Sequence, residues 1–205
     1  MTYANRRVFV VVPAAGCGSR MQSDRPKQYL PLRRSGQTVL QTTVLALLDV
    51  SEIDGIYVAV SPEDDYVETL AIPAAVLRTG GKTRAETVYQ TLEALSDTIA
   101  DDDLVLVHDA ARPFVQPQDV SNLIVRTQKG IEEGMCAGMV LAVPVLDTVK
   151  RVNEKGLLVE DVERNGLMRI ATPQCFPYRQ LKSALAGNLE ATDESSAMRD
   201  AGYAV

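Results

Sequence analysis

The apolar run at residues 8–12 leads directly into a turn of very small residues, and this junction constrains the fold more than any other feature. The run reads Val-Phe-Val-Val-Val, and residues 13–16 read Pro-Ala-Ala-Gly. Five consecutive apolar residues, mostly β-branched, are typical of a strand buried on both faces, as in a parallel sheet covered by helices. Small residues after such a strand let the backbone approach a ligand and present its N–H groups. The junction therefore predicts an α/β fold with a ligand site at the end of this strand.

The segment that follows this turn is cationic, although the chain as a whole is acidic. The 205 residues carry a formal net charge of -6. Between residues 16 and 34 the basic residues are Arg20, Arg25, Lys27, Arg33 and Arg34, against the single acid Asp24. Phosphates are the usual ligands of a backbone nest at the end of a strand. The local excess of positive charge therefore predicts a small bound polyanion.

Two familiar phosphate-binding motifs do not fit the chain. A dinucleotide fingerprint requires glycine at the sixth position of G-x-G-x-x-G, where this chain has Met21. The segment Gly81-Lys82-Thr83 imitates the end of a P-loop, but the first glycine of that motif would fall on Val76. The site is therefore neither a Rossmann cofactor site nor a Walker A loop.

Length and composition predict one soluble domain over residues 1–205. The hydrophobic fraction of 46% and the charged fraction of 23% are ordinary for a globular protein. No apolar run approaches the ~20 residues that span a bilayer, and residues 1–7 do not resemble a signal peptide. The three cysteines are widely spaced without a C-x-x-C pair, which favours a reducing cytoplasm and argues against zinc. The acidic charge argues against nucleic-acid binding.

Strand and helix patterns alternate along the chain, which is the signature of an α/β fold. The expected strands cover residues 8–12, 56–60, 76–77, 104–107 and 139–143. Helices are expected around 40–48, from Ser61 onward, over 83–96, around 120–124, over 178–185 and from Thr192 to about Gly202. Residues 203–205 resemble the start of a further strand. Ligands of open parallel sheets bind beyond the carboxyl ends of the strands, which is where Asp109 and Arg112 fall.

Residues 148–152 and 157–162 flank the turn residues 153–156, Asn-Glu-Lys-Gly, and predict a β-hairpin. An isolated two-stranded hairpin is only marginally stable in water. We therefore expect an arm at about residues 146–166 that packs against another surface, such as a second subunit. An unpartnered surface arm is the alternative.

With these segments placed, the chain resembles the 2-C-methyl-D-erythritol 4-phosphate cytidylyltransferase family. The matching segments appear in the family's order across nearly the whole chain, and they are highly specific in combination. They are residues 13–21, 26–28, 80–84, 108–113, 147–148, 164–167, 172–174 and 192–194. The resemblance implies a Rossmann-like nucleotidyltransferase fold with a mainly parallel sheet flanked by helices and a protruding β-hairpin that forms a homodimer.

The resemblance also implies a reaction, which belongs to the non-mevalonate pathway of isoprenoid biosynthesis. A phosphate oxygen of 2-C-methyl-D-erythritol 4-phosphate attacks the α-phosphorus of CTP, and pyrophosphate leaves. Such a transfer depends on positioning and charge neutralisation. Arg20 and Lys27 are then the catalytic cations, and Mg²⁺ is the cofactor on the triphosphate. The nucleophile is already an anion, so no general base is required.

Further site residues are carried over from the same resemblance. Those expected at the nucleotide are Ala14, Ala15, Gly16, Gly18, Gly81 and Thr87. Asp109 is expected near the sugar hydroxyls or the metal, and Thr172 and Thr192 near the sugar alcohol. Thr148 and Arg164 are expected to hold the substrate phosphate across the dimer interface, with Arg164 orienting it for attack. The family continues beyond this sequence with a strand and a helix that carry another lysine, which has no counterpart before Val205.

Other interpretations of these residues and of the function remain open at this point. Asp109 and the pair Thr192-Asp193 could be helix caps, and Gly80-Gly81 an ordinary turn. Arg112 is more often a structural ion-pair partner, and His108 more often a structural histidine. A ribitol-5-phosphate cytidylyltransferase shares most of the motifs, although it usually has Ala-Gly-Gly where residues 14–16 read Ala-Ala-Gly. The remaining alternative is a non-catalytic nucleotide-binding homologue.

Overall fold

The computed structural model describes residues 6–16, 26–33 and 36–205. The buried run at residues 8–12 forms β1, in the middle of a six-stranded sheet with the order β3-β2-β1-β4-β8-β5. The strands are β1 (Val8–Pro13), β2 (Gly55–Ala59), β3 (Ala75–Leu77), β4 (Leu104–Val107), β5 (Met139–Pro144) and β8 (Met168–Pro177). The first four are parallel, with β1 pairing β2 on one side and β4 on the other. The predicted, mainly parallel α/β sheet is confirmed.

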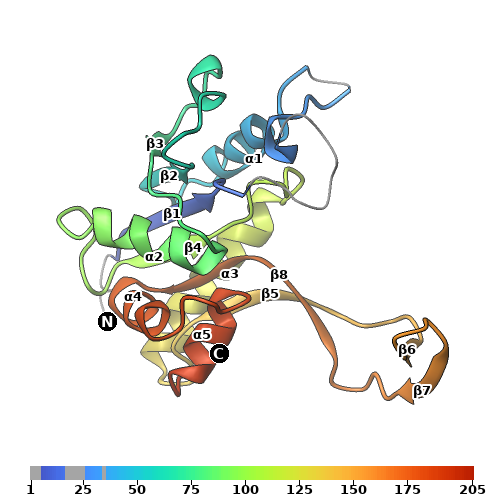
Figure 1. Cartoon of the computed structure of the whole chain (residues 1–205). Coiled ribbons are helices and arrows are strands. Elements are labelled where there is room, and N and C mark those ends of the chain that lie inside the picture. Colours follow the sequence, from blue (N-terminus) through green and yellow to red (C-terminus); the bar gives the residue numbers. More distant parts are fainter. Residues whose placement is uncertain (1–5, 17–25, 34–35) are drawn as a thin grey trace.

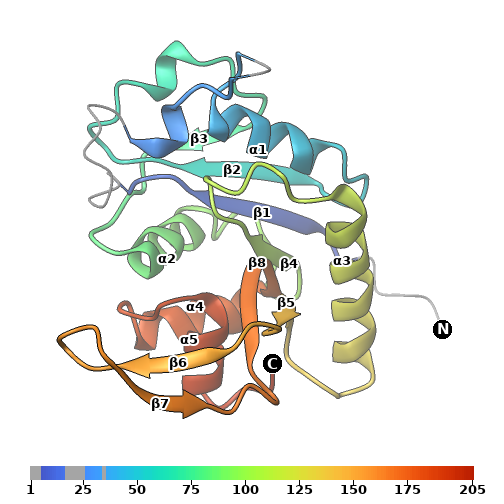
Figure 2. The same cartoon turned by 90° about the vertical axis from the view of Figure 1, so that its right-hand side faces the viewer.

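Both faces of the sheet are covered by helices, as the uninterrupted apolar run of β1 predicts (Figures 1 and 2). The helices are α1 (Val39–Leu48), α2 (Arg84–Ala94), α3 (Pro117–Glu132), α4 (Tyr178–Gly187) and α5 (Glu194–Asp200). Val8, Val10 and Val12 are buried with the apolar residues of α1 and α3. Phe9 and Val11 are buried on the opposite face with those of α2, α4 and α5. Because successive side chains of a strand point to opposite faces, the two alternating sets of β1 side chains are buried in two different cores.

Three helices begin at residues whose side chains cap them. Thr38 accepts a bond from the backbone of Gln41, whose side chain accepts one from the backbone of Thr38, so that α1 starts with a capping box. Thr83 caps α2 and Asp193 caps α5 by accepting bonds from backbone N–H groups three residues later. These caps fix where the helices that border the site begin.

The helix predicted from Ser61 onward is wrong. The segment instead turns and forms only the short 3-10 helix η2 (Val67–Thr69). The Asp64 side chain accepts bonds from the backbone N–H groups of Tyr66 and Val67, at 2.9 and 3.1 Å. The Ser61 hydroxyl instead donates to Glu63, at 2.7 Å. The side chains of Ser61 and Asp64, which could have capped a helix, therefore bond within local turns. Such turns compete with the formation of a longer helix.

Strand β8 is an element that the sequence patterns do not predict. It runs antiparallel to both neighbours, β4 and β5, although Pro173 lies inside it. A proline normally argues against a central strand because it donates no hydrogen bond. Here the β5–β8 register shifts between the pairs Val140–Gln174 and Ala142–Ile170, so Pro173 falls in the irregularity. The sheet is therefore mixed, because β8 lies antiparallel between β4 and β5.

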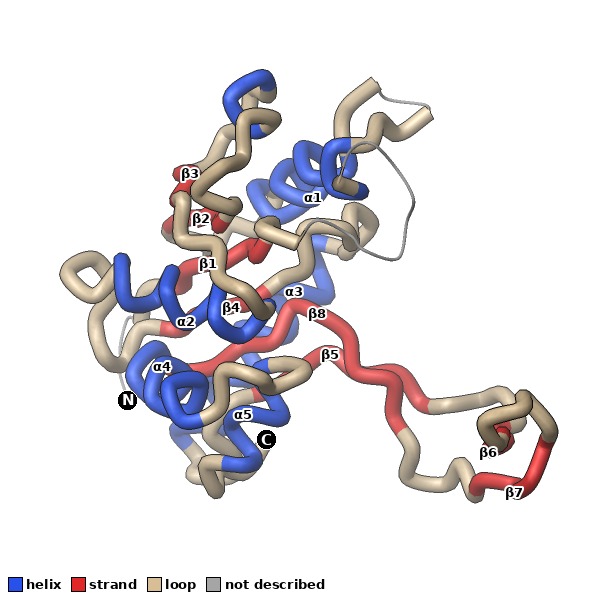
Figure 3. The backbone as a smooth tube through the Cα atoms, viewed as in Figure 1, coloured by secondary structure: helices blue, strands red, loops and turns tan. Residues whose placement is uncertain are grey.

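Beyond the sheet, β5 and β8 run side by side away from the body of the protein and lead to a small hairpin (Figures 1 and 3). The hairpin consists of β6 (Val149–Val152) and β7 (Leu158–Val162), which pair antiparallel. Its side chains Leu157, Leu158 and Val159 are 61%, 69% and 55% exposed. The hairpin lies where the sequence predicts one, and its role in dimerisation stays a prediction.

The remaining sequence predictions concern the chain end and membranes. Residues 203–205 are not in a strand, although the carbonyl of Ala204 accepts a bond of 2.8 Å from the N–H of Ala137. Within the described part of the chain, no helix combines the length and the apolar character that crossing a bilayer requires.

Candidate active site

A cleft of about 730 Å³ opens at the carboxyl ends of β1, β3 and β4. The connection that follows β1 contains α1, which covers one face of the sheet, whereas the connection that leads to β4 contains α2, which covers the other face. The cleft therefore lies at the topological switch point beside β1. Ligands of open α/β sheets bind at such points. The lining residues are 13–16, Lys27, Gln28, 81–84, Thr87 and 109–112. The cleft therefore gathers residues from four of the segments that carry the family resemblance.

The loop after β1 is held from within the protein. The N–H of Ala14 donates to the carbonyl of Ala59 at 2.7 Å. The side-chain amide of Gln28 donates to the carbonyls of Ala14, at 2.7 Å, and Gly16, at 3.1 Å. On the other side, a Cβ on Gly80 would lie only 2.5 Å from the Cβ of Ala15. The loop is thus confined between a buried amide and a residue that must be glycine.

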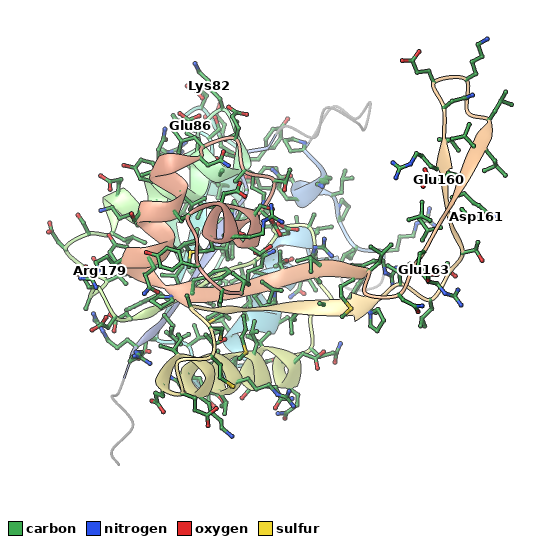
Figure 4. All side chains as sticks on the ribbon, turned by 90° about the horizontal axis from the view of Figure 1, so that it is seen from below. Lys82, Glu86, Glu160, Asp161, Glu163 and Arg179 are labelled. Atoms are coloured by element: carbon green, nitrogen blue, oxygen red, sulfur yellow. The ribbon has the colours of Figure 1, made fainter. Side chains whose placement is uncertain are left out.

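The first turn of α2 forms the wall of the cleft that faces this loop. The Thr87 hydroxyl accepts from the N–H of Gly81, at 3.0 Å, and donates to the carbonyl of Thr83, at 2.9 Å. Thr87 is only 2% exposed, so its hydroxyl shapes the Gly81 turn. Lys82 lies at the same helix start, where its N–H donates to Glu86 at 2.6 Å (Figure 4). The helix N-terminus and Lys82 both favour an anion in the cleft.

Asp109 follows β4 and is held by two arginines. Nε of Arg84 lies 3.0 Å from Oδ1 of Asp109, and Nε of Arg112 lies 2.9 Å from Oδ2. Burial opposes ionisation of this carboxyl, but the positive charges of Arg84 and Arg112 outweigh it and hold the pKa of Asp109 below its ordinary value. Asp109 is therefore an anion in a fixed orientation.

Arg84 also binds a second carboxylate, which comes from the far end of the chain. Its Nη1 lies 2.7 Å from Oε1 of Glu194, a residue with no exposed side-chain surface. Burial raises the pKa of the Glu194 carboxyl, while Arg84 opposes that rise. The charges alternate along Glu194, Arg84, Asp109 and Arg112, so the start of α5 is connected to the cleft through α2. This arrangement fixes the Arg84 guanidinium between two anions.

His108 is buried directly behind Asp109. Its Nδ1 lies 3.1 Å from the Thr172 hydroxyl, which also accepts from the N–H of Asp109 at 3.1 Å. Its Nε2 lies 3.1 Å from the carbonyl of Arg112, which can only accept. We therefore assign a proton to Nε2, with Nδ1 accepting from Thr172. Burial lowers the pKa of His108, which agrees with this neutral, structural histidine.

The structure brings together many of the site residues predicted from the sequence. Those that line the cleft are Ala14, Ala15, Gly16, Lys27, Gly81, Thr87 and Asp109. Arg20 and Gly18 lie outside the described residues. Thr172 and Thr192 do not line this cleft: the Thr172 hydroxyl is bound to His108, and that of Thr192 lies 3.2 Å from the Ser196 hydroxyl.

Thr148 and Arg164 belong to the arm, which leads away from this cleft. Figure 4 shows Glu160 and Asp161 on the arm, well apart from Lys82 at the edge of the cleft. The Arg164 guanidinium donates to the carbonyl of Leu146 within the same arm. Neither Thr148 nor Arg164 lines the cleft of its own chain.

Sequence reasoning missed three residues that organise the site: Gln28, Arg84 and Glu194. Each belongs to a segment that carried the family resemblance, but none received a role. Gln28 and Glu194 are 3% and 0% exposed, and both are polar. A polar residue is buried only with bonding partners, and those partners lie far away in the sequence. The identities of the segments could therefore have flagged these residues, but the contacts could not be read from the sequence.

The described residues contain no group of three or more histidine, cysteine or acidic residues that could hold a metal ion. Asp109 is the one carboxylate among the described lining residues of the cleft. Any metal here would need most of its oxygen ligands from a bound substrate, which is usual for Mg²⁺ with phosphates.

Comparison with known proteins decides the family to which this site belongs. The family model described as 2-C-methyl-D-erythritol 4-phosphate cytidylyltransferase matches residues 8–205. The chain belongs to this family. A relative of that name from Alteromonas mediterranea is 45% identical over 206 residues, which cover 97% of this chain and 82% of the relative. One from Haemophilus influenzae (strain PittGG) is 41% identical over 203 residues, covering 97% of this chain and 85% of the relative.

Solved structures agree with this family assignment. A crystal structure of 4-diphosphocytidyl-2C-methyl-D-erythritol synthase is similar with a TM-score of 0.81 and 35% identity, covering 97% of this chain and 86% of that one. The family member from Thermus thermophilus has a TM-score of 0.74 and 31% identity, with coverages of 97% and 86%. The family resemblance predicted from the sequence is confirmed, and with it that the chain is a cytidylyltransferase enzyme.

Proposed function

We propose that this cytidylyltransferase transfers CMP from CTP to 2-C-methyl-D-erythritol 4-phosphate, and that the cleft beside β1 is its active site. A phosphate oxygen of the sugar phosphate forms a bond to the α-phosphorus of CTP. The bond from that phosphorus to the bridging oxygen breaks, and pyrophosphate leaves with the electron pair. The observation that carries this assignment is the cleft itself, in which Lys27, Asp109 and the small-residue loop meet at the family's motif positions.

The nucleotide occupies the side of the cleft between the loop after β1 and the first turn of α2. Residues 14–16 and Gly81 offer backbone groups with little side-chain bulk, which suits close contact with the base and ribose. Lys27 lines the same cleft, where its compact charge stabilises the α-phosphoryl group as it is attacked. Arg20 and Gly18 are assigned to the same cradle from their places in the motif.

The sugar phosphate lies on the side of Asp109. This carboxylate is ionised and oriented by Arg84 and Arg112, so it can accept hydrogen bonds from the sugar hydroxyls. Thr172 supports the same loop through the N–H of Asp109, and its substrate contact would add to that role. Thr192 is assigned to the sugar alcohol from the motif, beside the cap of α5.

Mg²⁺ is the proposed cofactor, and the donor set of the cleft fits it. Asp109 would be its ligand from the protein, because each of its oxygens accepts one arginine bond and keeps a lone pair. The remaining ligands would be triphosphate oxygens and water. When bound, the ion neutralises charge on the triphosphate and on the departing pyrophosphate.

A homodimer formed through the arm completes the proposed site. Thr148 and Arg164 lie on the arm, away from the cleft of their own chain, while the arm exposes several large apolar side chains. Exposed apolar side chains on a protruding hairpin favour burial against a second copy. In that dimer, Thr148 and Arg164 would hold the phosphate of the sugar in the partner's cleft.

We assign the enzyme to the cytoplasm, in line with its free cysteines Cys136 and Cys175.

The test is pyrophosphate release from CTP with Mg²⁺ and one of two sugar-alcohol phosphates. We expect turnover with 2-C-methyl-D-erythritol 4-phosphate and little with ribitol 5-phosphate. Turnover with ribitol 5-phosphate alone would replace the proposed substrate, and CTP binding without turnover on either would indicate a non-catalytic homologue. The relatives at 45% and 41% identity favour the first outcome.

A further inference from the structure

Gln28 is a buried polar side chain that lies next to the proposed catalytic Lys27 and contacts the nucleotide loop directly. It is 3% exposed, and its amide nitrogen donates to the carbonyls of Ala14 and Gly16. These two bonds use both N–H groups of the amide. One side chain thus joins two segments that are more than ten residues apart in the sequence.

The three consecutive side chains of the short 3-10 helix η1 (Lys27–Tyr29) lie in three different environments. Lys27 lines the cleft. Tyr29 is 4% exposed, packs in the core beside α1 and donates to Asp64 at 2.5 Å. Gln28 reaches from this anchored turn to the loop after β1. The position of the Lys27 backbone is therefore tied to that of the loop.

The bond to Ala14 also sets the direction of a backbone donor. Because the Ala14–Ala15 peptide is trans, its N–H points opposite to its C=O. The C=O points to Gln28, so the N–H of Ala15 points away from Gln28. Among the described residues this N–H has no hydrogen-bond partner, whereas the N–H of Ala14 is bound to Ala59. Ala15 thus keeps a donor that is free for a ligand of the cleft.

We propose that Gln28 is a positioning residue for CTP: its amide holds the Ala14–Ala15 peptide so that the N–H of Ala15 points to the nucleotide. The same contact fixes the position of this N–H relative to Lys27. This inference rests on the proposed function, because it takes the loop as the nucleotide cradle. Gly80 supports the arrangement from the other side, since any side chain there would push Ala15 out of place. Gln28 itself needs no contact with the substrate.

The experiment compares Gln28→Met and Gln28→Glu with the wild-type enzyme. Met keeps the length of the side chain without donors, whereas Glu places a carboxylate against two carbonyl oxygens. CTP binding with Mg²⁺ is measured by titration calorimetry, together with KM for CTP and Tm. We expect Kd and KM for CTP to rise about tenfold in Gln28→Met at unchanged stoichiometry, with a larger rise in Gln28→Glu.

Gln41→Met is the matched control, because this glutamine bonds to backbone in the cap of α1 and does not line the cleft. It should lower Tm while leaving Kd for CTP unchanged. A Gln28→Met enzyme with a lower Tm, a reduced fraction of binding sites and an unchanged Kd would overturn the inference in favour of a purely structural role. Absence of CTP binding by the wild type would instead overturn the proposed function, and the inference with it.

Discussion

Oε1 of Glu194 lies 2.7 Å from Nη1 of Arg84, although the two residues are 110 positions apart in the sequence. Nε of the same guanidinium lies 3.0 Å from Asp109. One arginine therefore joins a fully buried carboxylate to a carboxylate in the cleft. A planar guanidinium can serve two carboxylates at once, whereas a lysine ammonium at the end of a flexible stem cannot match that geometry.

Arg84→Lys should therefore weaken both stability and catalysis. We expect a loss of about 2–3 kcal/mol in the free energy of unfolding, because one carboxylate loses its partner, and Glu194 is fully buried. KM for 2-C-methyl-D-erythritol 4-phosphate should rise about tenfold as Asp109 loses its orientation. Urea unfolding and steady-state kinetics measure the two effects.

Arg179→Lys is the control for this substitution, because the guanidinium of Arg179 pairs with Asp101 and both side chains are exposed at the surface. It should change the free energy of unfolding by less than about 0.5 kcal/mol and leave KM unchanged. Equal effects of the two substitutions would remove the special role of Arg84.

Lys27→Ala should lower kcat far more than it raises KM for CTP. If Lys27 neutralises charge that develops on the α-phosphoryl group, its loss costs about 10²- to 10³-fold in kcat. Rapid-quench measurement of the pyrophosphate formed in the first turnover separates this step from product release. An unchanged kcat would remove Lys27 from the transition state. Lys129→Ala, on the exposed side of α3, is the matched control.

Asp193 should make stability depend on pH in the acidic range. Burial opposes its ionisation, but hydrogen bonds from Ser196, Gln174 and Ser195 outweigh burial and hold its pKa below the ordinary value of about 4. The stabilisation is therefore present above pH ~4 and is lost as the pH falls through the lowered pKa. Asp193→Asn should cost about 1 kcal/mol at pH 7 and less at pH 3.

Urea unfolding at the two pH values measures this difference. Asp49→Asn, at the exposed end of α1, removes a carboxylate of the same type and corrects for the change in net charge. A destabilisation by Asp193→Asn that is as large at pH 3 as at pH 7 would contradict the assignment.

The arm can be tested by complementation between two inactive variants. If each site combines Lys27 of one chain with Arg164 of the other, a mixed dimer of Lys27→Ala and Arg164→Ala contains one intact site. Random mixing should then restore about a quarter of the wild-type activity, because half of the dimers are mixed. Activity of the unmixed variants gives the baseline, and no recovery after verified subunit exchange would refute a shared site.

Sedimentation of Leu158→Asp tests the dimer itself. Leu158 is 69% exposed on β7, so a charge there should disfavour burial against a second subunit and shift the enzyme toward monomer. Val125→Asp, at a 55% exposed position on α3, is the matched control and should leave the sedimentation unchanged. A wild-type monomer with full activity would contradict the proposed dimer.

Local patterns were sufficient where neighbours in the sequence decide the structure. Adjacent residues decide the strand at β1, the cap at Asp193 and the spacing of α2, and each of these was predicted. The prediction failed at Ser61, where Asp64 closes a competing turn, and at β8, where a register shift accommodates Pro173. The first failure is a competition between local structures, which the pattern alone does not rank, whereas the second depends on strand pairing with segments far away in the sequence.

By itself, the sequence determined an α/β protein whose first strand ends in a turn of small residues, and its motif order determined the family. Only the tertiary structure decided which side chains hold that turn. Gln28 reaches the loop after β1, Thr172 supports Asp109 through its backbone N–H, and Glu194 fixes Arg84. The physical reason is that buried polar groups must find partners, and the fold supplies those partners from segments far apart in the chain. The turn after β1 was readable from its apolar strand and small residues, but its rigidity comes from contacts that the sequence does not display.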